Sequence, residues 1–242
     1  MADKMKVLVT GAAGLVGGHL REFWGDRYQL RLTDIRPVDN LAAHEEYAAM
    51  DITDYEAFLA ACEGMDAVVH LAADPSMDAE FYETLLPLNI IGCYNGFEAA
   101  RQAGCKRIVF ASSINAILGF GYDPDYYPVP WDAPVYPVNV YGATKCFGEA
   151  LGRVYAHQHS LSCIMVRIGG AAWQQCGDQG TIRREAGITG RDQAQLFARC
   201  LEAPSDVDFK IVHGTSNHTM QWMDLEVSRE LGYEPEDGTA LA

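Results

Sequence analysis

Short apolar runs rich in branched side chains recur along the chain with helix-like segments between them, and this alternation constrains the fold more than any other feature. Strands are predicted at residues 6–11, 29–34, 47–51, 67–72, 107–112 and 162–169. Helices are predicted to begin near Leu15, Tyr55, Phe81, Tyr141 and Arg191. Strands that alternate with helices are typical of a parallel sheet covered on both faces. The pattern predicts an α/β fold with a doubly wound, Rossmann-type parallel sheet.

Composition excludes several classes of partner. The formal net charge of -15 opposes binding to a phosphate backbone, so no nucleic-acid partner is expected. No apolar run approaches the roughly 18 residues that a transmembrane helix requires, so no membrane span is expected either. The 7 cysteines form neither C-x-x-C pairs nor clusters with histidine. They predict reduced thiols in a cytoplasmic protein that has no metal site.

Two irregular stretches follow predicted strands. Residues 119–139 are dense in Pro, Tyr and Asp, and residues 169–187 contain several glycines and arginines. Long loops in compact domains are often functional, and open α/β sheets bind ligands beyond the carboxyl ends of their strands. The two loops are therefore predicted to cap one crevice.

The stretch TGAAGLVG places Gly11, Gly14 and Gly17 between the first predicted strand and helix. Glycines let a backbone approach a pyrophosphate, whose charge the N-terminus of the helix can then stabilise. Taken alone, the pattern is equally compatible with a tight turn of small residues.

Acidic residues end the next two predicted strands. Asp34 is placed where a carboxylate accepts hydrogen bonds from the ribose hydroxyls of a dinucleotide, which favours NAD over NADP. Arg36 softens that preference, and a turn-forming role for Asp34 is the alternative. Asp51 and Ile52 are placed to border an adenine, although a helix cap explains Asp51 equally well.

Tyr141 and Lys145 in YGATK lie four residues apart and so share one face of a predicted helix. An ammonium close to a phenol favours the phenolate, which can accept a proton from a substrate hydroxyl. Ser112 and Ser113 end the preceding strand, so a serine hydroxyl could meet the phenol across the crevice. A turn or cap role for these serines is the alternative.

In combination, TGAAGLVG, Asp34, HLAA, the serines after VFA and YGATK resemble the extended short-chain dehydrogenase/reductase superfamily, in its NAD-dependent epimerase/dehydratase branch. VFASS, VYGATKCFGE, VRIG, VHGTSNH and LGYEPED are similar to the hexuronate dehydrogenases and related sugar dehydrogenases. The resemblance implies oxidation of a sugar's anomeric hydroxyl by NAD to a lactone.

The resemblance also implies roles for individual residues. Tyr141 would be the general base, Lys145 would hold the nicotinamide ribose, and Ser113 would hydrogen-bond the reacting hydroxyl. The remaining cofactor-binding residues that it implies are Leu15, Val16, Leu71, Ala72, Ala73, Asn89 and Ile168.

Substrate contacts are where the chain departs from its relatives. It has Ser-Ser-Ile-Asn where the hexuronate dehydrogenases have Ser-Ser-Asn-His, which puts Asn115 in the sugar pocket in place of the histidine pattern. Ser76 and Ser113 are also predicted substrate-binding residues. Arg183 or Arg184 is a candidate to grip a carboxylate or phosphate, and a solvated arginine pair is the alternative.

These predictions divide the chain into an NAD-binding core with the catalytic helix (1–168) and a small substrate-capping portion (169–242), packed as one unit. The predicted function is NAD-dependent oxidation of a hexuronic acid or related aldose. A nucleotide-sugar epimerase or dehydratase and a non-catalytic NAD-binding protein are the alternatives. The resemblance further implies a homodimer built on the YxxxK helices.

Overall fold

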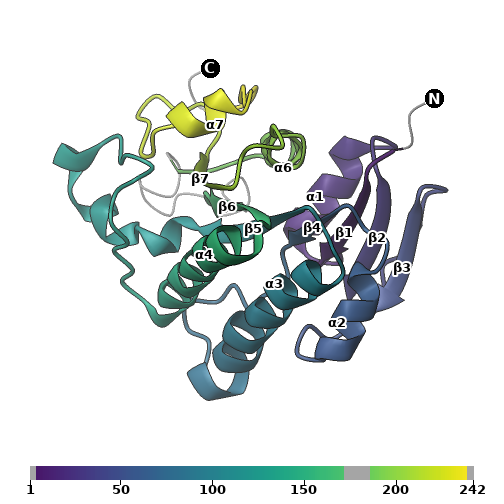
Figure 1. Ribbon diagram of the computed structural model, residues 1–242. Coiled ribbons are helices and arrows are strands. Elements are labelled where there is room, and N and C mark those ends of the chain that lie inside the picture. Colours follow the sequence, from purple (N-terminus) through teal and green to yellow (C-terminus); the bar gives the residue numbers. More distant parts are fainter. Residues whose placement is uncertain (1–3, 172–185, 239–242) are drawn as a thin grey trace.

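A parallel sheet forms the centre of the computed structural model, which describes residues 4–171 and 186–238 (Figure 1). The 7 strands lie in the order β3-β2-β1-β4-β5-β6-β7, and every neighbouring pair is parallel. Their bounds are β1 (Lys6–Thr10), β2 (Gln29–Asp34), β3 (Glu45–Ala49), β4 (Ala67–His70), β5 (Arg107–Ser113), β6 (Ser162–Ile168) and β7 (Phe209–Gly214). The doubly wound sheet predicted from the sequence is confirmed.

Helices cover both faces of the sheet. One face carries α1 (Leu15–Trp24) and α6 (Gly190–Leu201), and the other carries α2 (Tyr55–Cys62), α3 (Cys93–Gln102) and α4 (Val140–His159) (Figure 1). Side chains alternate between the faces, because successive residues of a strand point to opposite sides. In β1, Val7 and Val9 join the core beneath α1 and α6, whereas Leu8 joins the core beneath α2, α3 and α4. Burial on both sides explains why the central strands are apolar throughout.

Three elements differ from the sequence-based expectation. Strand β3 begins and ends two residues earlier than predicted, because hydrogen bonds to β2 set its register and its own side chains are largely exposed. Strand β7 was not predicted, since Lys210 interrupts a half-buried run. The helix predicted from Phe81 is π-helical over Phe81–Gly92 before α3 begins, and it contains Pro87, which has no N–H for an ordinary helical hydrogen bond.

The predicted long loop joins β5 to α4. It contains short 3₁₀ turns at Ile114–Ala116, Leu118–Tyr122 and Pro124–Tyr126. A small apolar cluster holds it against the segment that precedes α7 (Glu226–Glu230), with Ile117 and Val129 packed on Trp222 and Met223. The loop is thereby fixed beside the carboxyl ends of β5 and β6.

Two tight glycine turns lie at the amino ends of the central strands β4 and β5, opposite the pocket. Gly64 and Gly104 adopt φ angles of +73° and +77° just after α2 and α3, where a left-handed residue ends a helix.

Within residues 4–171 and 186–238, no helix has the length and apolar character needed to cross a membrane. The same part of the chain contains no cluster of His, Cys, Asp and Glu that could hold a metal ion.

Candidate active site

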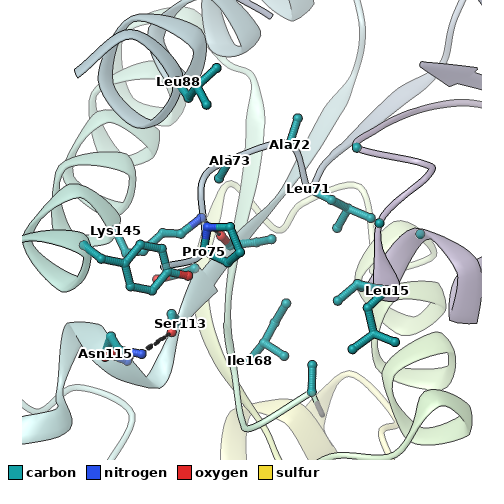
Figure 2. A pocket seen from close by; sticks show the side chains of 18 of the residues that line it. Leu15, Leu71, Ala72, Ala73, Pro75, Leu88, Ser113, Asn115, Lys145 and Ile168 are labelled. Atoms are coloured by element: carbon teal, nitrogen blue, oxygen red, sulfur yellow. Dashed lines mark hydrogen bonds between the residues drawn. The ribbon is translucent and has the colours of Figure 1, made fainter. Parts of the chain in front are cut away.

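A pocket of about 980 Å³ runs along the carboxyl ends of the central strands (Figure 2). This volume lies at the upper end of the range for cofactor sites. Most predicted site residues line it: Gly11, Gly14, Leu15, Val16, Gly17, Asp34, Asp51, Ile52, Leu71, Ala72, Ala73, Ser113, Asn115, Tyr141, Lys145 and Ile168. Residues distant in sequence therefore share one cavity, as the strand ends of a doubly wound sheet allow.

The glycine turn between β1 and α1 has two tight spots. Gly11 has φ +70°, and a Cβ there would lie 2.8 Å from the Ala72 amide nitrogen. A Cβ on Gly17 would lie 2.6 Å from the carbonyl oxygen of Ala12. Larger residues would separate β1 from the loop after β4 and lift α1 off the turn. Glycine is thus required here for close packing as well as for ligand approach.

The N-terminus of α1 suits a diphosphate. Gly14 is its N-cap, so no side chain caps the first turn, and no acidic residue lies within that turn. The leading N–H groups of a helix have no partner inside it and carry partial positive charge. Since Gly14, Leu15 and Val16 line the pocket, these N–H groups border the cavity and can bind an anionic ligand there.

Asp34 lies at the end of β2 and is 9% exposed. Its Oδ2 accepts from the Ala13 N–H at 3.0 Å, and its Oδ1 accepts from the Arg36 N–H at 3.0 Å. The carboxylate therefore shapes the turn and lines the pocket at once, and it keeps acceptor capacity for ribose hydroxyls. The Arg36 guanidinium is only 3.5 Å from Oδ1 and largely exposed.

Asp51 lines the pocket without capping a helix. Its carboxylate accepts from the Thr53 N–H at 2.9 Å and from the Thr53 hydroxyl at 2.8 Å. The cap of α2 is Asp54, whose side chain accepts from the Ala57 N–H. The stretch DITD therefore caps the helix through Asp54 and not through Asp51, and both Asp51 and Ile52 line the pocket.

Tyr141 and Lys145 project from the first turns of α4 toward the end of β5. Lys145 is 4% exposed, and its ammonium donates to the Ala111 carbonyl at 2.8 Å and lies 5.6 Å from the centre of the Tyr141 ring. Lysine has three N–H donors, so the contact with Ala111 leaves others for a bound ligand. Ser113 ends β5 at the same end of the pocket, beside Asn115 (Figure 2).

Two predicted residues lie outside the pocket lining. Asn89 is buried, and its amide donates to the Asp74 carbonyl at 3.0 Å and to the Thr144 hydroxyl at 3.1 Å. It ties the loop after β4 to α4 and so supports the pocket from behind. Ser76 is exposed, and its hydroxyl accepts from the Asp78 N–H. Arg183 and Arg184 lie outside the described residues.

Sequence reasoning missed a buried ionic network beneath the end of the pocket that Ser113, Tyr141 and Lys145 line. Glu149 forms two hydrogen bonds of 2.9 Å with Arg167 and accepts from the Ser112 hydroxyl at 2.6 Å. Tyr141, Lys145 and Glu149 follow each other at four-residue spacing on one face of α4. The available signal was Arg167 within a largely apolar strand, because a buried charge needs a charged or hydrogen-bonding partner.

Two buried histidines hold the walls of the site. His70 contacts the Thr10 hydroxyl at 2.7 Å, and that hydroxyl also accepts from the Ala72 N–H, which fixes the loop after β4. His213 faces the Asp224 carbonyl at 3.1 Å. Burial lowers the pKa of each histidine to about 3, and nearby Lys145 and Arg167 add to the effect at His70 and His213 respectively. Both side chains are therefore neutral and structural.

Several lining residues could not be named beforehand. They include Met50, Pro75, Met77, Leu88, Ile114, Leu118, Tyr122, Gly169, Gly170 and Ala171. Most come from the loops after β4, β5 and β6, whose path depends on tertiary packing. Tyr122, Gly169, Gly170 and Ala171 lie in the two loops predicted to cap the crevice, and for the others only their position near predicted strand ends was a signal.

Comparisons with known proteins agree with this geometry. The model of the NAD dependent epimerase/dehydratase family matches residues 7–172. An NAD-dependent glucose-6-phosphate dehydrogenase from Haloferax volcanii is 34% identical over 97% of this chain and 94% of its own. A uronate dehydrogenase from Pseudomonas putida is 36% identical over 97% of this chain and 85% of its own.

Solved structures point the same way. A mutant uronate dehydrogenase from Agrobacterium tumefaciens, complexed with NAD, superposes with a TM-score of 0.85 at 35% identity, over 98% of this chain and 86% of its own. A UDP-galactose 4-epimerase superposes with a TM-score of 0.76 at 22% identity and shares the fold. The chain belongs to the NAD-dependent epimerase/dehydratase family.

Proposed function

We propose that this protein is an NAD-dependent sugar dehydrogenase that oxidises the hydroxyl on the anomeric carbon of a hexuronic acid or related aldose to a lactone. The observation that carries the proposal is the meeting of Ser113, Tyr141 and Lys145 at one end of a pocket whose other end holds Asp34. Relatives named for glucose 6-phosphate, uronate and L-arabinose oxidation support the sugar.

Residues of this chain would accept the proton that leaves the sugar hydroxyl and position the group that accepts it. Tyr141 accepts the proton of the sugar hydroxyl as the general base, and the Lys145 ammonium lies 5.6 Å from the centre of its ring. The Ala111 carbonyl holds the ammonium in place at 2.8 Å. Ser113 hydrogen-bonds the same sugar oxygen. Bound NAD would supply the hydride acceptor for the carbinol carbon. As the C–O bond becomes a carbonyl, the proton of the sugar hydroxyl goes to Tyr141.

Cofactor placement follows from charge. The N-terminus of α1 would hold the diphosphate, and the Asp34 carboxylate would accept from the adenosine ribose hydroxyls. A 2′-phosphate would meet that carboxylate, which favours NAD. Leu71, Ala72 and Ala73 would line the dinucleotide, with Ile168 beside the nicotinamide and Asn89 supporting the site.

The sugar would lie between the loop after β5 and the segment after β6. Asn115 and Ser113 line this end, and so do Gly169, Gly170 and Ala171. This placement supports a substrate-covering role for residues 169–242. Arg183 or Arg184 would grip a carboxylate or phosphate. Ser76 is exposed and does not line the pocket, although its neighbours Pro75 and Met77 do, so the proposal gives it no contact with the sugar.

NADH formation on a sugar panel tests the proposal directly. The panel contains uronic acids, sugar phosphates and neutral aldoses, each assayed with NAD at several concentrations. Steady NADH production that is lost in Tyr141→Phe is the expected result. Interconversion of a nucleotide sugar without net NADH would support the epimerase alternative. Tight NAD binding without turnover of any sugar would support a non-catalytic role.

We also propose a homodimer built on α3 and α4, which lie side by side on one face of the sheet (Figure 1). Large apolar side chains are exposed there and in the last turn of the π-helical segment Phe81–Gly92, among them Ile91 (45%), Tyr94 (47%) and Val154 (42%). Sedimentation velocity of the protein and of Tyr94→Glu tests the assembly. The free thiols of the described cysteines support a cytoplasmic location, which cell fractionation would test.

A further inference from the structure

Hydrogen bonds link the N-terminus of α4 to Ser113 through two asparagine side chains. The Gly142 N–H donates to Asn139 Oδ1 at 2.7 Å, which makes Asn139 the N-cap of the catalytic helix. A backbone N–H can only donate, so the amide oxygen of Asn139 must face it. The amide nitrogen of Asn139 must then point the other way.

The direction of every later bond follows from this first one. Asn139 Nδ2 donates to Asn115 Oδ1 at 2.8 Å, and Asn115 Nδ2 donates to Ser113 Oγ at 3.1 Å. The backbone N–H of Asn115 also donates to Ser113 Oγ, again at 3.1 Å. A serine oxygen has two acceptor lone pairs and one O–H donor. Both lone pairs are occupied, and the proton alone remains available.

We propose that Asn139 and Asn115 are positioning residues that make Ser113 a hydrogen-bond donor, and not an acceptor, toward the substrate oxygen. Ser113 lines the pocket at the same end as Tyr141 and Lys145. The inference rests on the proposed function, since the oxygen concerned is that of the oxidised sugar hydroxyl. Asn115, expected to contact the sugar, uses its amide oxygen and one N–H within the protein.

The direction matters for the chemistry. As the hydroxyl proton moves to Tyr141, the sugar oxygen gains negative charge and then becomes a carbonyl oxygen, which only accepts. A donor from Ser113 therefore binds the transition state more strongly than the starting hydroxyl. An accepting serine would hold the proton that Tyr141 has to remove. The asparagine chain would thus raise kcat with little effect on substrate affinity.

The substitution Asn139→Asp should reverse the direction of these side-chain hydrogen bonds while keeping the N-cap of α4. Aspartate is as good an N-cap as asparagine, so the Gly142 N–H keeps its acceptor. Its second oxygen can only accept, which turns the Asn115 amide over and presents Asn115 Oδ1 to Ser113. The Ser113 proton is then drawn toward Asn115. We expect kcat to fall at least tenfold, with the KM for NAD within about twofold of wild type.

Ser113→Ala and the double variant separate positioning from general damage. If Asn139 acts through the Ser113 proton, the double variant loses no more kcat than Ser113→Ala alone. Asn40→Asp adds the same charge at an exposed turn and serves as the control. An unchanged kcat in Asn139→Asp, or losses that add in the double variant, would overturn the proposal.

Neutron diffraction from deuterated crystals of the wild-type protein tests the direction of these hydrogen bonds without any sugar. Nuclear scattering distinguishes nitrogen from oxygen and locates the Ser113 deuterium. We expect both asparagine amides in the stated orientation and the deuterium directed into the pocket. A reversed amide, or a deuterium directed at Asn115, would refute the proposal. A protein that oxidises no sugar would instead refute the proposed function, and the neutron result would still decide the hydrogen-bond direction.

Discussion

The two ends of the pocket are built in different ways. The end proposed to hold the adenosine (the adenosine end) consists of one short turn and one carboxylate, with Gly11, Gly17 and Asp34 acting largely through backbone conformation and close packing. The catalytic end joins β5 to α4, and buried side chains fix that junction. The first end is local in sequence and the second is not. Binding of the dinucleotide and chemistry on the sugar should therefore respond to different substitutions.

Tyr141→Phe should give the largest separation of the two ends. The ring stays and the proton acceptor is lost, so kcat should fall about 10³-fold. NAD affinity, measured by calorimetry, should stay within about twofold, because the adenosine end is untouched. Tyr82→Phe, at a side chain that is 81% exposed, is the control. More than a tenth of the wild-type kcat in Tyr141→Phe would rule out Tyr141 as the base.

Glu149→Gln should loosen the catalytic end from beneath. The substitution leaves the Arg167 guanidinium, only 1% exposed, without its carboxylate. Removing one partner of a buried pair costs at least about 3 kcal/mol of unfolding free energy, which urea titration would measure. Glu46→Gln breaks an exposed pair with Arg31 and should cost about 1 kcal/mol at most. Equal losses of unfolding free energy in the two variants would show that the buried pair stabilises the fold no more than the exposed pair does.

Gly11→Ala should damage the adenosine end. The new Cβ would be strained at φ +70° and would press on the Ala72 amide, at a cost of about 2 kcal/mol. NAD affinity should fall about tenfold, which fluorescence titration would show. Gly18→Ala is the matched control, because its Cβ enters open space within α1. That control should gain about 0.5 to 1 kcal/mol of stability. Similar NAD affinities in both variants would refute the packing argument.

Asp34→Asn should have the smallest effect and change cofactor preference. The amide nitrogen can only donate, so the side chain loses one of the two oxygens that accept from the Ala13 and Arg36 N–H groups and, with it, acceptor capacity for the ribose. The neutral amide also no longer repels a 2′-phosphate near Arg36. The ratio of kcat/KM for NAD to that for NADP should fall about tenfold. Asp39→Asn, on the exposed loop after β2, should leave the ratio unchanged. An unaltered ratio in Asp34→Asn would remove Asp34 from cofactor selection.

Sequence could predict the local parts of the molecule and not the non-local ones. The glycine turn, Asp34 and the Tyr141/Lys145 pair each come from a short contiguous pattern with its own periodicity or spacing. The central strands were recognisable for the same reason, since burial on both faces makes them uniformly apolar.

The remainder depends on contacts between distant segments. Arg167 pairs with Glu149, and Asn139 reaches Asn115, only once β5, β6 and α4 are packed together. Strand β7 carries Lys210 among its apolar residues and was invisible as a strand until β6 provided its neighbour. No local pattern encodes such partnerships.

The left-handed turns at Gly64 and Gly104 have a practical consequence. The two turns precede the central strands β4 and β5 and so lie at the amino ends of the strands, opposite the pocket. A peptide tag or surface linker inserted there would leave substrate entry free. A molecule tethered to a support through either turn would present its cofactor cleft outward. Because all strands are parallel, the pocket lies at their carboxyl ends and the attachment points lie at their amino ends. This separation suits the protein to immobilisation on an electrode or bead.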